Sequence, residues 1–454
     1  MANEAQTNKM GTMPIGPLLA KMAIPIMISM LAQALYNIVD SIFVAKLSEN
    51  ALNAVSLAFP LQNLMIGTGV GTAIGMNALL ARSLGAKRQD AADQAANTGI
   101  FLVFCCTALF ALIGLFLVRP FYLVQTDDAE IIGYGITYGK ICLIGSLGLF
   151  GQLFCERALQ ATGRSSLSML TQLLGAVINI VLDPILIFGL FGFPRMEVAG
   201  AAVATVIGQI IAALLGLYLN LRHNPEIHFS LRRIRWHSAT VREIFRVGTP
   251  TIVMQATSSL MIFGMNLILI SFTKTATAVF GAYFKLQSFV FMPVIGLNNG
   301  MVPIVSFNFG ARDPERVRKT VFLTIGVAVL IMVLGALLFE LCPALLLSFF
   351  SPSEQMLEIG VPALRIIATE FPIAGFCIIA GSTCQAIGNP MFSLISSLCR
   401  QLVILLPAAE LLARTGVLEM VWLSFPIAAV LCAVMNFYFI RKTLRSADAR
   451  MRQA

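Results

Sequence analysis

Charged residues are scarce in this sequence. Of its 454 residues, 12% are Asp, Glu, Lys or Arg and 58% are hydrophobic, and the mean hydropathy is +0.85. A soluble chain of this length needs a polar surface that so few charges cannot supply. The apolar runs are also too continuous for a membrane β-barrel, whose strands alternate and whose lumen is polar. The sequence therefore predicts an all-α integral membrane protein.

Residue types that build reactive sites are also few. All three histidines, His223, His228 and His237, fall in one polar segment, so we expect no histidine-based metal or catalytic site within the membrane. The nine cysteines lie in apolar segments without CxxC spacing, which favours packed thiols. The sequence has no Walker-type phosphate loop, so ATP is not the expected direct energy source. We expect neither enzymatic activity nor a cofactor.

About twelve apolar runs are long enough to span a membrane. Residues 1–17 are polar and the first run is already of spanning length, so no cleavable signal peptide is expected. The predicted spans are 18–45, 53–80, 95–118, 131–154, 166–190, 198–221, 245–272, 278–306, 320–345, 357–383, 391–413 and 417–440.

Basic residues are concentrated in alternate connections between the spans. If the N-terminus is cytoplasmic, most Lys and Arg fall in inner segments, including Arg232 and Arg233. This positive-inside bias predicts a multi-pass protein of the inner (cytoplasmic) membrane with both termini in the cytoplasm. We further expect a monomer surrounded by membrane lipid. The formal net charge of +9 is explained by this placement and requires no nucleic-acid partner.

Motifs recur at a constant offset of 225 residues. Six spans per half return the chain to the same side of the membrane, so the repeat is parallel. We expect an N-terminal six-helix lobe (1–221), a basic connector (222–244), a C-terminal six-helix lobe (245–441) and a tail (442–454). The matching motifs are Pro25 with Pro250, Leu61-Gln62 with Leu286-Gln287, Gly85-Ala86-Lys87 with Gly310-Ala311-Arg312, and Gln160-Ala161-x-Gly163 with Gln385-Ala386-x-Gly388.

Glycines in the second predicted span form a ladder of small residues. They are Gly67, Gly69, Gly71 and Gly75. Such ladders allow neighbouring helices to pack closely in a membrane. We therefore expect a close helix contact there and no phosphate-binding loop.

The fifth predicted span carries polar residues in its apolar interior. Asn179 and Asp183 are four residues apart and share one helix face, and Pro184 invites a bend. Asp40 and Thr205 lie at about the same depth as Asp183, roughly 10 Å from the outer end of their spans. At the equivalent positions of the second half, 225 residues further on, the sequence has Met265 for Asp40 and Ala408 for Asp183. These two acids therefore occur in one half only. This asymmetry favours function over a purely architectural role.

Two carboxyl groups in a low-dielectric pocket cannot both ionise without a large cost in free energy. Such a pair takes up a proton or a monovalent cation, or faces an organic cation. Asn179 and Thr205 can supply neutral oxygens, so Asp40, Asn179 and Asp183 would be metal ligands if the ion is Na⁺. Competition between ion and organic cation for one negative charge is the simplest chemistry of antiport.

Other charges within the spans have two interpretations each. Glu156, at the cytoplasmic end of the fourth span, either pairs with Arg157 or helps a substrate to enter. Glu370 pairs with Arg365 or Arg400 for packing, which we favour, or belongs to a second site. Lys285 could oppose an acidic group across a cavity.

The ordered set of motifs resembles the multidrug and toxic compound extrusion (MATE) family, and its DinF/MepA-like prokaryotic branch in particular. The segments are Gln33-Ala-Leu-Tyr36-Asn37-Ile-Val-Asp40 after Pro25, Leu84-Gly85-Ala86-Lys87, Gln160-Ala-x-Gly163 and Asn179-Ile-Val-Leu-Asp183-Pro184. The resemblance implies a multidrug exporter that couples efflux of amphipathic organic cations to H⁺ or Na⁺ by alternating access.

The resemblance also implies roles for single residues. Asp40, Asn179, Asp183 and Thr205 match the amino-lobe cation site. Residues assigned to the substrate site are Glu156, Asp183, Gln33, Tyr36 and Asn37. A carboxyl-lobe site in other branches has acids in the seventh and tenth spans, where this chain has Gln255 and Glu370. Lys285 of the eighth span is a further candidate for such a site. The alternative is a flippase of lipid-linked saccharides or another metabolite exporter of the same superfamily.

Overall fold

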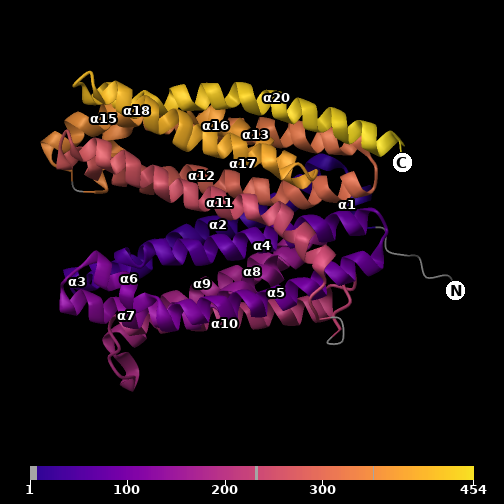
Figure 1. Cartoon of the computed structure of the whole chain (residues 1–454), viewed down its shortest axis with the longest axis horizontal. Coiled ribbons are helices and arrows are strands. Elements are labelled where there is room, and N and C mark those ends of the chain that lie inside the picture. The colour runs from indigo at the N-terminus through magenta and orange to yellow at the C-terminus, as the bar shows by residue number, and fades with distance from the viewer. Residues whose placement is uncertain (1–7, 231–233, 351, 454) are drawn as a thin grey trace. The chain divides into compact units, whose positions relative to one another are not determined.

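The computed structural model describes residues 8–230, 234–350 and 352–453. These residues form helices and connecting segments without a strand (Figure 1), which confirms the predicted all-α class. Arg232 and Arg233 of the predicted connector lie outside the described residues.

In the described chain, ten helices are long and apolar enough to cross a membrane, and two bent helix pairs raise the total to twelve if each pair is one span. The predicted multi-pass architecture is therefore confirmed. The long helices are α2 (Ile15–Ala45), α4 (Phe59–Gly85), α5 (Gln89–Phe116), α9 (Ser165–Phe188), α10 (Val198–His223), α11 (Ser238–Ile270), α12 (Lys274–Gly310), α13 (Pro314–Leu341), α17 (Pro390–Leu398) continued by η3 (Cys399–Leu405) and α18 (Leu406–Ala413), and α20 (Ser424–Gln453). Short helices between them are α1 (Lys9–Thr12), α3 (Glu49–Leu57), α6 (Val118–Gln125), η1 (Leu190–Gly192), α14 (Pro343–Ser348) and α19 (Leu418–Trp422).

The predicted spans 131–154 and 357–383 are each broken. The first consists of α7 (Ala129–Ile144) and α8 (Leu147–Ala161), bent by 43°, and the second of α15 (Glu354–Ala368) and α16 (Phe371–Ala386), bent by 47°. Gly145 is the C-terminal cap of α7. Pro372 is the second residue of α16 and has no N–H to donate to the preceding turn. Apolar content predicts a span but does not reveal these breaks, which occur at equivalent positions of the repeat.

Backbone geometry repeats as well. Lys87 and Arg312, 225 residues apart, adopt the left-handed conformation with φ of 56° and 61°. The equivalent glycines Gly163 and Gly388 have φ of 82° and 94°. A left-handed lysine and arginine are unusual, so their recurrence shows that both halves use the same turn.

A side-chain hydrogen bond follows the same repeat. Gln160 Nε2 donates to Ser168 Oγ at 2.9 Å, and Gln385 Nε2 donates to Ser393 Oγ at 2.9 Å. In both halves this bond joins the end of one helix to the start of the next, so the repeated Gln-Ala-x-Gly motif fixes a helix connection.

The chain divides into two compact units that cut through two helices. Unit 1 comprises Met1–Thr12 and Ile28–Ile252, and unit 2 comprises Met13–Met27 and Val253–Ala454. The divisions fall near Pro25 in α2 and Pro250 in α11. Each half of the sequence therefore contributes the first part of its first long helix to the other unit.

Glycines make room for these exchanged segments. In unit 1, a Cβ on Gly75 of α4 would lie 2.1 Å from the carbonyl oxygen of Ile244 in α11. In unit 2, a Cβ on Gly300 of α12 would lie 2.8 Å from the Cα of Ala23 in α2. Gly300 is the repeat partner of Gly75, so both contacts use one geometry. The close helix packing predicted for the glycine ladder is confirmed at Gly75.

The described part of the connector lies against the end of unit 1. The backbone N–H groups of His228 and Ser230 donate to the side chains of Asp93 and Asn97, each at 2.9 Å. Asn97 Nδ2 returns a hydrogen bond to the carbonyl of His228 at 3.0 Å. Asp93 and Asn97 of α5 therefore hold this part of the connector through its backbone.

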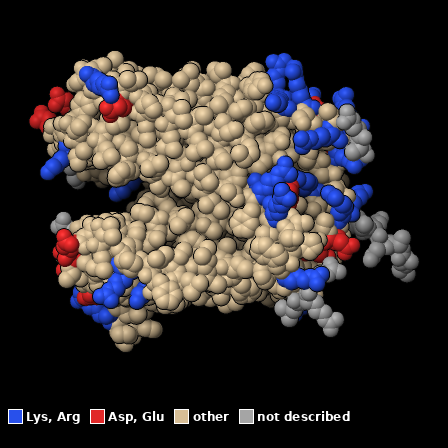
Figure 2. Space-filling view, in the orientation of Figure 1, with Lys and Arg blue, Asp and Glu red and all other residues tan. Residues whose placement is uncertain are grey.

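Lys and Arg side chains gather where α20 ends (Figure 2). This segment carries Arg441, Lys442, Arg445, Arg450 and Arg452. Earlier in α20, Val434 and Phe437 are exposed, as expected of side chains that lipid covers. The cytoplasmic location of both termini stays a prediction.

We predict that Gly75→Ala destabilises the protein. The added methyl group forces α4 and α11 apart, and overpacking of this kind costs about 1–3 kcal/mol. The apparent melting temperature of the purified protein should fall by several degrees. Gly281→Ala in α12 is the matched control, because a Cβ there meets nothing within 4 Å. Equal melting temperatures for the two variants would contradict the packing described.

Candidate functional site

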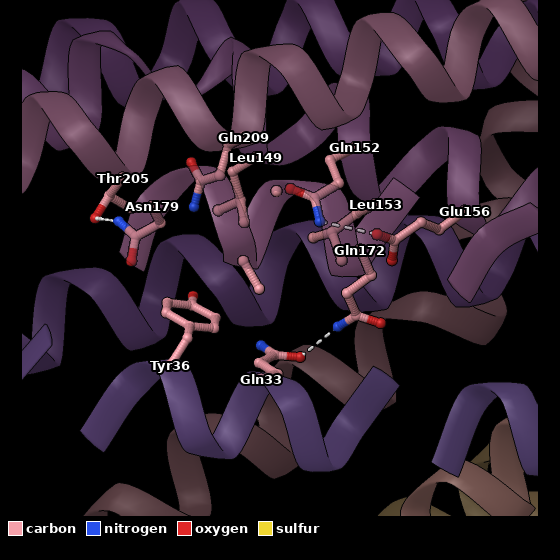
Figure 3. A pocket seen from close by; sticks show the side chains of 12 residues that line it. Gln33, Tyr36, Leu149, Gln152, Leu153, Glu156, Gln172, Asn179, Thr205 and Gln209 are labelled. Atoms are coloured by element: carbon pink, nitrogen blue, oxygen red, sulfur yellow. Dashed lines mark hydrogen bonds between the residues drawn. The ribbon is translucent and has the colours of Figure 1, made fainter. Parts of the chain in front are cut away.

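Unit 1 contains a polar cavity of about 60 Å³ between four helices (Figure 3). A buried water needs about 10–15 Å³, so the cavity has room for a few waters or a small ion. Its lining residues come from α2, α8, α9 and α10: Gln33, Tyr36, Leu149, Gln152, Leu153, Glu156, Gln172, Gly175, Ala176, Asn179, Thr205 and Gln209.

Five predicted site residues line this cavity. They are Gln33, Tyr36, Glu156, Asn179 and Thr205. Glu156 lies toward one end of the cavity and Asn179 with Thr205 toward the other, with Gln33 and Tyr36 of α2 facing them (Figure 3). The structure thus brings together residues that are up to 172 positions apart.

Sequence reasoning missed three glutamines of the cavity, Gln152, Gln172 and Gln209. Gln152 precedes Glu156 by four residues and Gln209 follows Thr205 by four. Polar residues at this spacing share a helix face. The same spacing rule that identified Asn179 and Asp183 could therefore have found Gln152 and Gln209.

Glu156 is buried in the cavity wall with 5% of its surface exposed. Gln152 Nε2 donates to Glu156 Oε1 at 2.8 Å, while Arg157 Nη1 donates to Gln160 at 3.0 Å. The predicted Glu156–Arg157 pairing is therefore not made by a direct contact in the described chain. Glu156 also lies inside α8, because that helix continues to Ala161.

Asn179 connects the cavity to the buried carboxyl of Asp183. A hydrogen bond of 3.1 Å joins the amide of Asn179 to the hydroxyl of Thr205. In the amide orientation that satisfies both neighbours, Asn179 donates to Asp183 Oδ2 at 3.2 Å and accepts from Thr205. Asp183 is fully buried. The three residues form one chain of hydrogen bonds from α9 to α10.

Asp40 and Asp183 lie one helical turn beyond the cavity residues Tyr36 and Asn179. Their carboxyl groups interact electrostatically. Two ionised carboxylates at such a site repel each other, and a shared proton or a bound cation relieves this repulsion. Asp40 Oδ1 is buried without a hydrogen-bond partner among the described residues. The predicted acidic pair is therefore assembled, with an open acceptor.

One residue of the predicted substrate site lies elsewhere. Asn37 is exposed on α2 and does not line the cavity. It follows Tyr36 directly, so its side chain is turned by about 100° around the helix. Asn37 therefore lies on another face of α2 than Tyr36, and its role in substrate binding stays a prediction.

Within the described part of the chain, no hydrogen bond or ion pair joins the residues predicted for a second site in the C-terminal half. Gln255 is exposed. Lys285 Nζ lies 6.0 Å from the ring centre of Phe350, not beside an acidic group of the described chain. Glu370 is buried and accepts from Arg400 Nη2 at 3.0 Å. The favoured interpretation of Glu370 as half of an ion pair matches this contact.

Comparison with known sequences gives matches along the whole chain. The MatE family model matches residues 25–185 and again 250–410, which confirms the repeat at an offset of 225. A FAD transporter of Shewanella oneidensis is 26% identical over 439 residues, covering 96% of both chains. The multidrug export protein MepA of Staphylococcus haemolyticus is 26% identical over 426 residues, covering 92% of this chain and 91% of that protein.

Solved structures show the same fold. An outward-facing multidrug resistance MATE family transporter of the MOP superfamily has a TM-score of 0.92 and 24% identity, with 98% of this chain and 99% of that chain covered. A MOP superfamily transporter from Pyrococcus furiosus, described as having a binding pocket of reverse polarity, has a TM-score of 0.89 and 24% identity, covering 97% and 98%. With its family model matched twice, the chain belongs to the MatE family and is a MATE transporter of the MepA/DinF-like branch.

Proposed function

We propose that this transporter exports amphipathic organic cations in exchange for H⁺ or Na⁺. The observation that carries the proposal is the buried carboxylate of Glu156 in a cavity that Asn179 links to the Asp40–Asp183 pair. A negative group in a low-dielectric wall attracts a cation strongly because little water screens it. The similarity to MepA proteins, named for multidrug export, supports the same function.

The cavity lining suits a cation with an apolar body. Glu156 supplies the charge, glutamine carbonyls supply acceptors and the ring of Tyr36 offers a π face. The cavity is too small for an amphipathic drug, so substrate binding must widen it. Gln172 Nε2 donates to Gln33 Oε1 at 2.8 Å between α9 and α2. We propose that substrate entry breaks this hydrogen bond as α2 moves from α9.

The acidic pair provides the coupling. A proton or Na⁺ that reaches Asp40 and Asp183 removes the negative charge that holds the organic cation, and the cation then leaves. Loss of the ion on the inside restores the charge. Each unit charge that crosses 100 mV contributes about 2.3 kcal/mol. With both termini cytoplasmic, the ion enters from outside and drives export.

A second candidate is export of a metabolite, which one relative's name favours. The matched Shewanella protein is a FAD transporter, and FAD carries phosphate groups. A flippase or metabolite exporter would need a basic cavity from Lys285, Arg365 and Arg400. Arg365 Nε instead donates to the carbonyl of Glu340 at 3.2 Å, and Lys285 lies over Phe350. Arg400 is the basic residue that keeps this candidate open.

We predict that Asp183→Asn abolishes coupled efflux. In proteoliposomes, the unchanged protein should move ethidium under an imposed pH gradient or an Na⁺ gradient, and the responding gradient identifies the ion. The ethidium efflux rate of the variant should be at least tenfold lower, because an amide cannot exchange a proton or neutralise a cation. Glu410→Gln is the control, since Glu410 is exposed and pairs with Arg414 at the end of α18. If neither gradient moves ethidium in the unchanged protein, the cation exporter is ruled out.

We predict a different defect for Glu156→Gln. Loss of the cavity carboxylate should raise the apparent KM for ethidium about tenfold while the rate at saturating dye stays near that of the unchanged protein. The reason is that Glu156 contributes charge to substrate binding alone, whereas the Asp40–Asp183 pair holds the organic cation and the coupling ion in turn. Initial efflux rates over a range of dye concentrations separate the two parameters. A lost maximal rate with an unchanged KM would assign Glu156 to coupling instead.

A further inference from the structure

The ion pair of Glu370 and Arg400 is asymmetric in its burial. Arg400 lies on η3, and its Nη2 donates to Glu370 Oε2 at 3.0 Å. The Glu370 side chain is 2% exposed, whereas that of Arg400 is 21% exposed. Any molecule that approaches the pair from its open side therefore meets the guanidinium and not the carboxylate.

Most of the hydrogen-bonding capacity of Arg400 is unused. A guanidinium has five N–H donors arranged as a planar fork that matches a carboxylate or phosphate. Among the described residues, Glu370 is its hydrogen-bond partner, and the contact uses one terminal nitrogen. The exposed edge of the fork remains available to a second acceptor.

Two further polar groups, one that interacts electrostatically with the pair and one on the next residue in sequence, have no hydrogen-bond partner among the described residues. The hydroxyl of Tyr283 in α12 is buried without a hydrogen-bond partner and lies within electrostatic range of both Glu370 and Arg400. Gln401 Oε1, on the residue after Arg400, is also buried without a partner. Buried polar groups without partners are rare, and they favour a site that a ligand or water completes.

The repeat relates Arg400 to the cavity of unit 1. Position 400 corresponds to Gly175, which lines that cavity. The positions that correspond to Glu156 and Asp183 are Gly381 and Ala408. At these equivalent positions, unit 2 therefore has the guanidinium of Arg400 where unit 1 has a glycine without a side chain. It has no carboxyl group at the positions of Glu156 and Asp183.

The depth of Arg400 limits what can reach it. Its candidate span runs over Pro390–Ala413, so Arg400 is about ten residues, or roughly 15 Å, from the near end. Lipid phosphates lie at the membrane surface and do not reach this depth. A charge here is expected to face a bundle interior or a water-filled path. The ligand must therefore arrive along the transport path.

We propose that Arg400 forms an anion subsite in unit 2 for the carboxylate or phosphate of an aromatic amphiphile. The proposal rests on the proposed export function and extends its substrate class to zwitterions and anions. Glu370 holds the guanidinium when the subsite is empty, and the incoming anion competes with it for the N–H donors. The buried hydroxyl of Tyr283, which interacts electrostatically with both members of the pair, is a further candidate donor.

Binding of FMN and riboflavin to the purified full-length protein tests the subsite. The two probes share the flavin ring and differ by one phosphate, and flavin fluorescence reports both. The unchanged protein should bind FMN at least tenfold more tightly than riboflavin. Arg400→Gln should remove this preference, and Arg400→Lys should keep part of it. Glu370→Gln should strengthen FMN binding severalfold, because the internal competitor is gone.

The opposite effects of the two charge-neutralising variants separate a ligand site from a packing contact. If Arg400→Gln and Glu370→Gln weaken FMN binding equally, or if Arg400→Gln keeps the preference, the proposal is wrong. Ethidium efflux by each variant reports folding and the export function independently. Should the unchanged protein fail to export ethidium, the proposed function fails, while the ratio of FMN to riboflavin affinity still decides the subsite.

Discussion

The placement of half-buried Asp40 beside fully buried Asp183 is the constraint on which the N-terminal site depends. Two carboxyl groups away from water are tolerated when a proton, a cation or a hydrogen bond removes part of their charge. Asn179 supplies one such bond to Asp183 and continues it to Thr205. One turn away, the same helices present Tyr36 and Asn179 to the cavity. The need to neutralise the pair thus connects ion binding to substrate binding.

The two halves of the internal repeat share their helix packing but differ in their polar side chains. Close backbone approaches at Gly75 and Gly300 build the same helix exchange in both units. The polar side chains on that frame differ: acids and amides surround the cavity of unit 1, whereas Arg400 occupies the position in unit 2 that corresponds to Gly175. A glycine contact depends on shape and is repeated, but a charge depends on the ligand and can change independently. We therefore propose that one frame serves ligands of opposite charge.

The parts of the fold that follow from periodicity could be predicted from the sequence. Long apolar runs gave the spans, and the constant offset gave the repeat. Asn179 and Asp183 were found because residues four apart share a helix face. The breaks after α7 and α15 were not predicted, because hydropathy does not change when one backbone hydrogen bond is lost. Asn37 was assigned to the substrate site together with Tyr36 because a motif does not specify which of its residues faces the cavity.

Ethidium affinity measured against pH and against Na⁺ concentration tests the central claim most directly. If ion and dye compete for the charge of Asp40 and Asp183, raising the concentration of the coupling ion weakens ethidium binding to the purified protein, and linkage requires the reverse effect as well. In Asp183→Asn this dependence should vanish. An affinity that is independent of both ions in the unchanged protein, or a dependence that persists in the variant, would contradict the account.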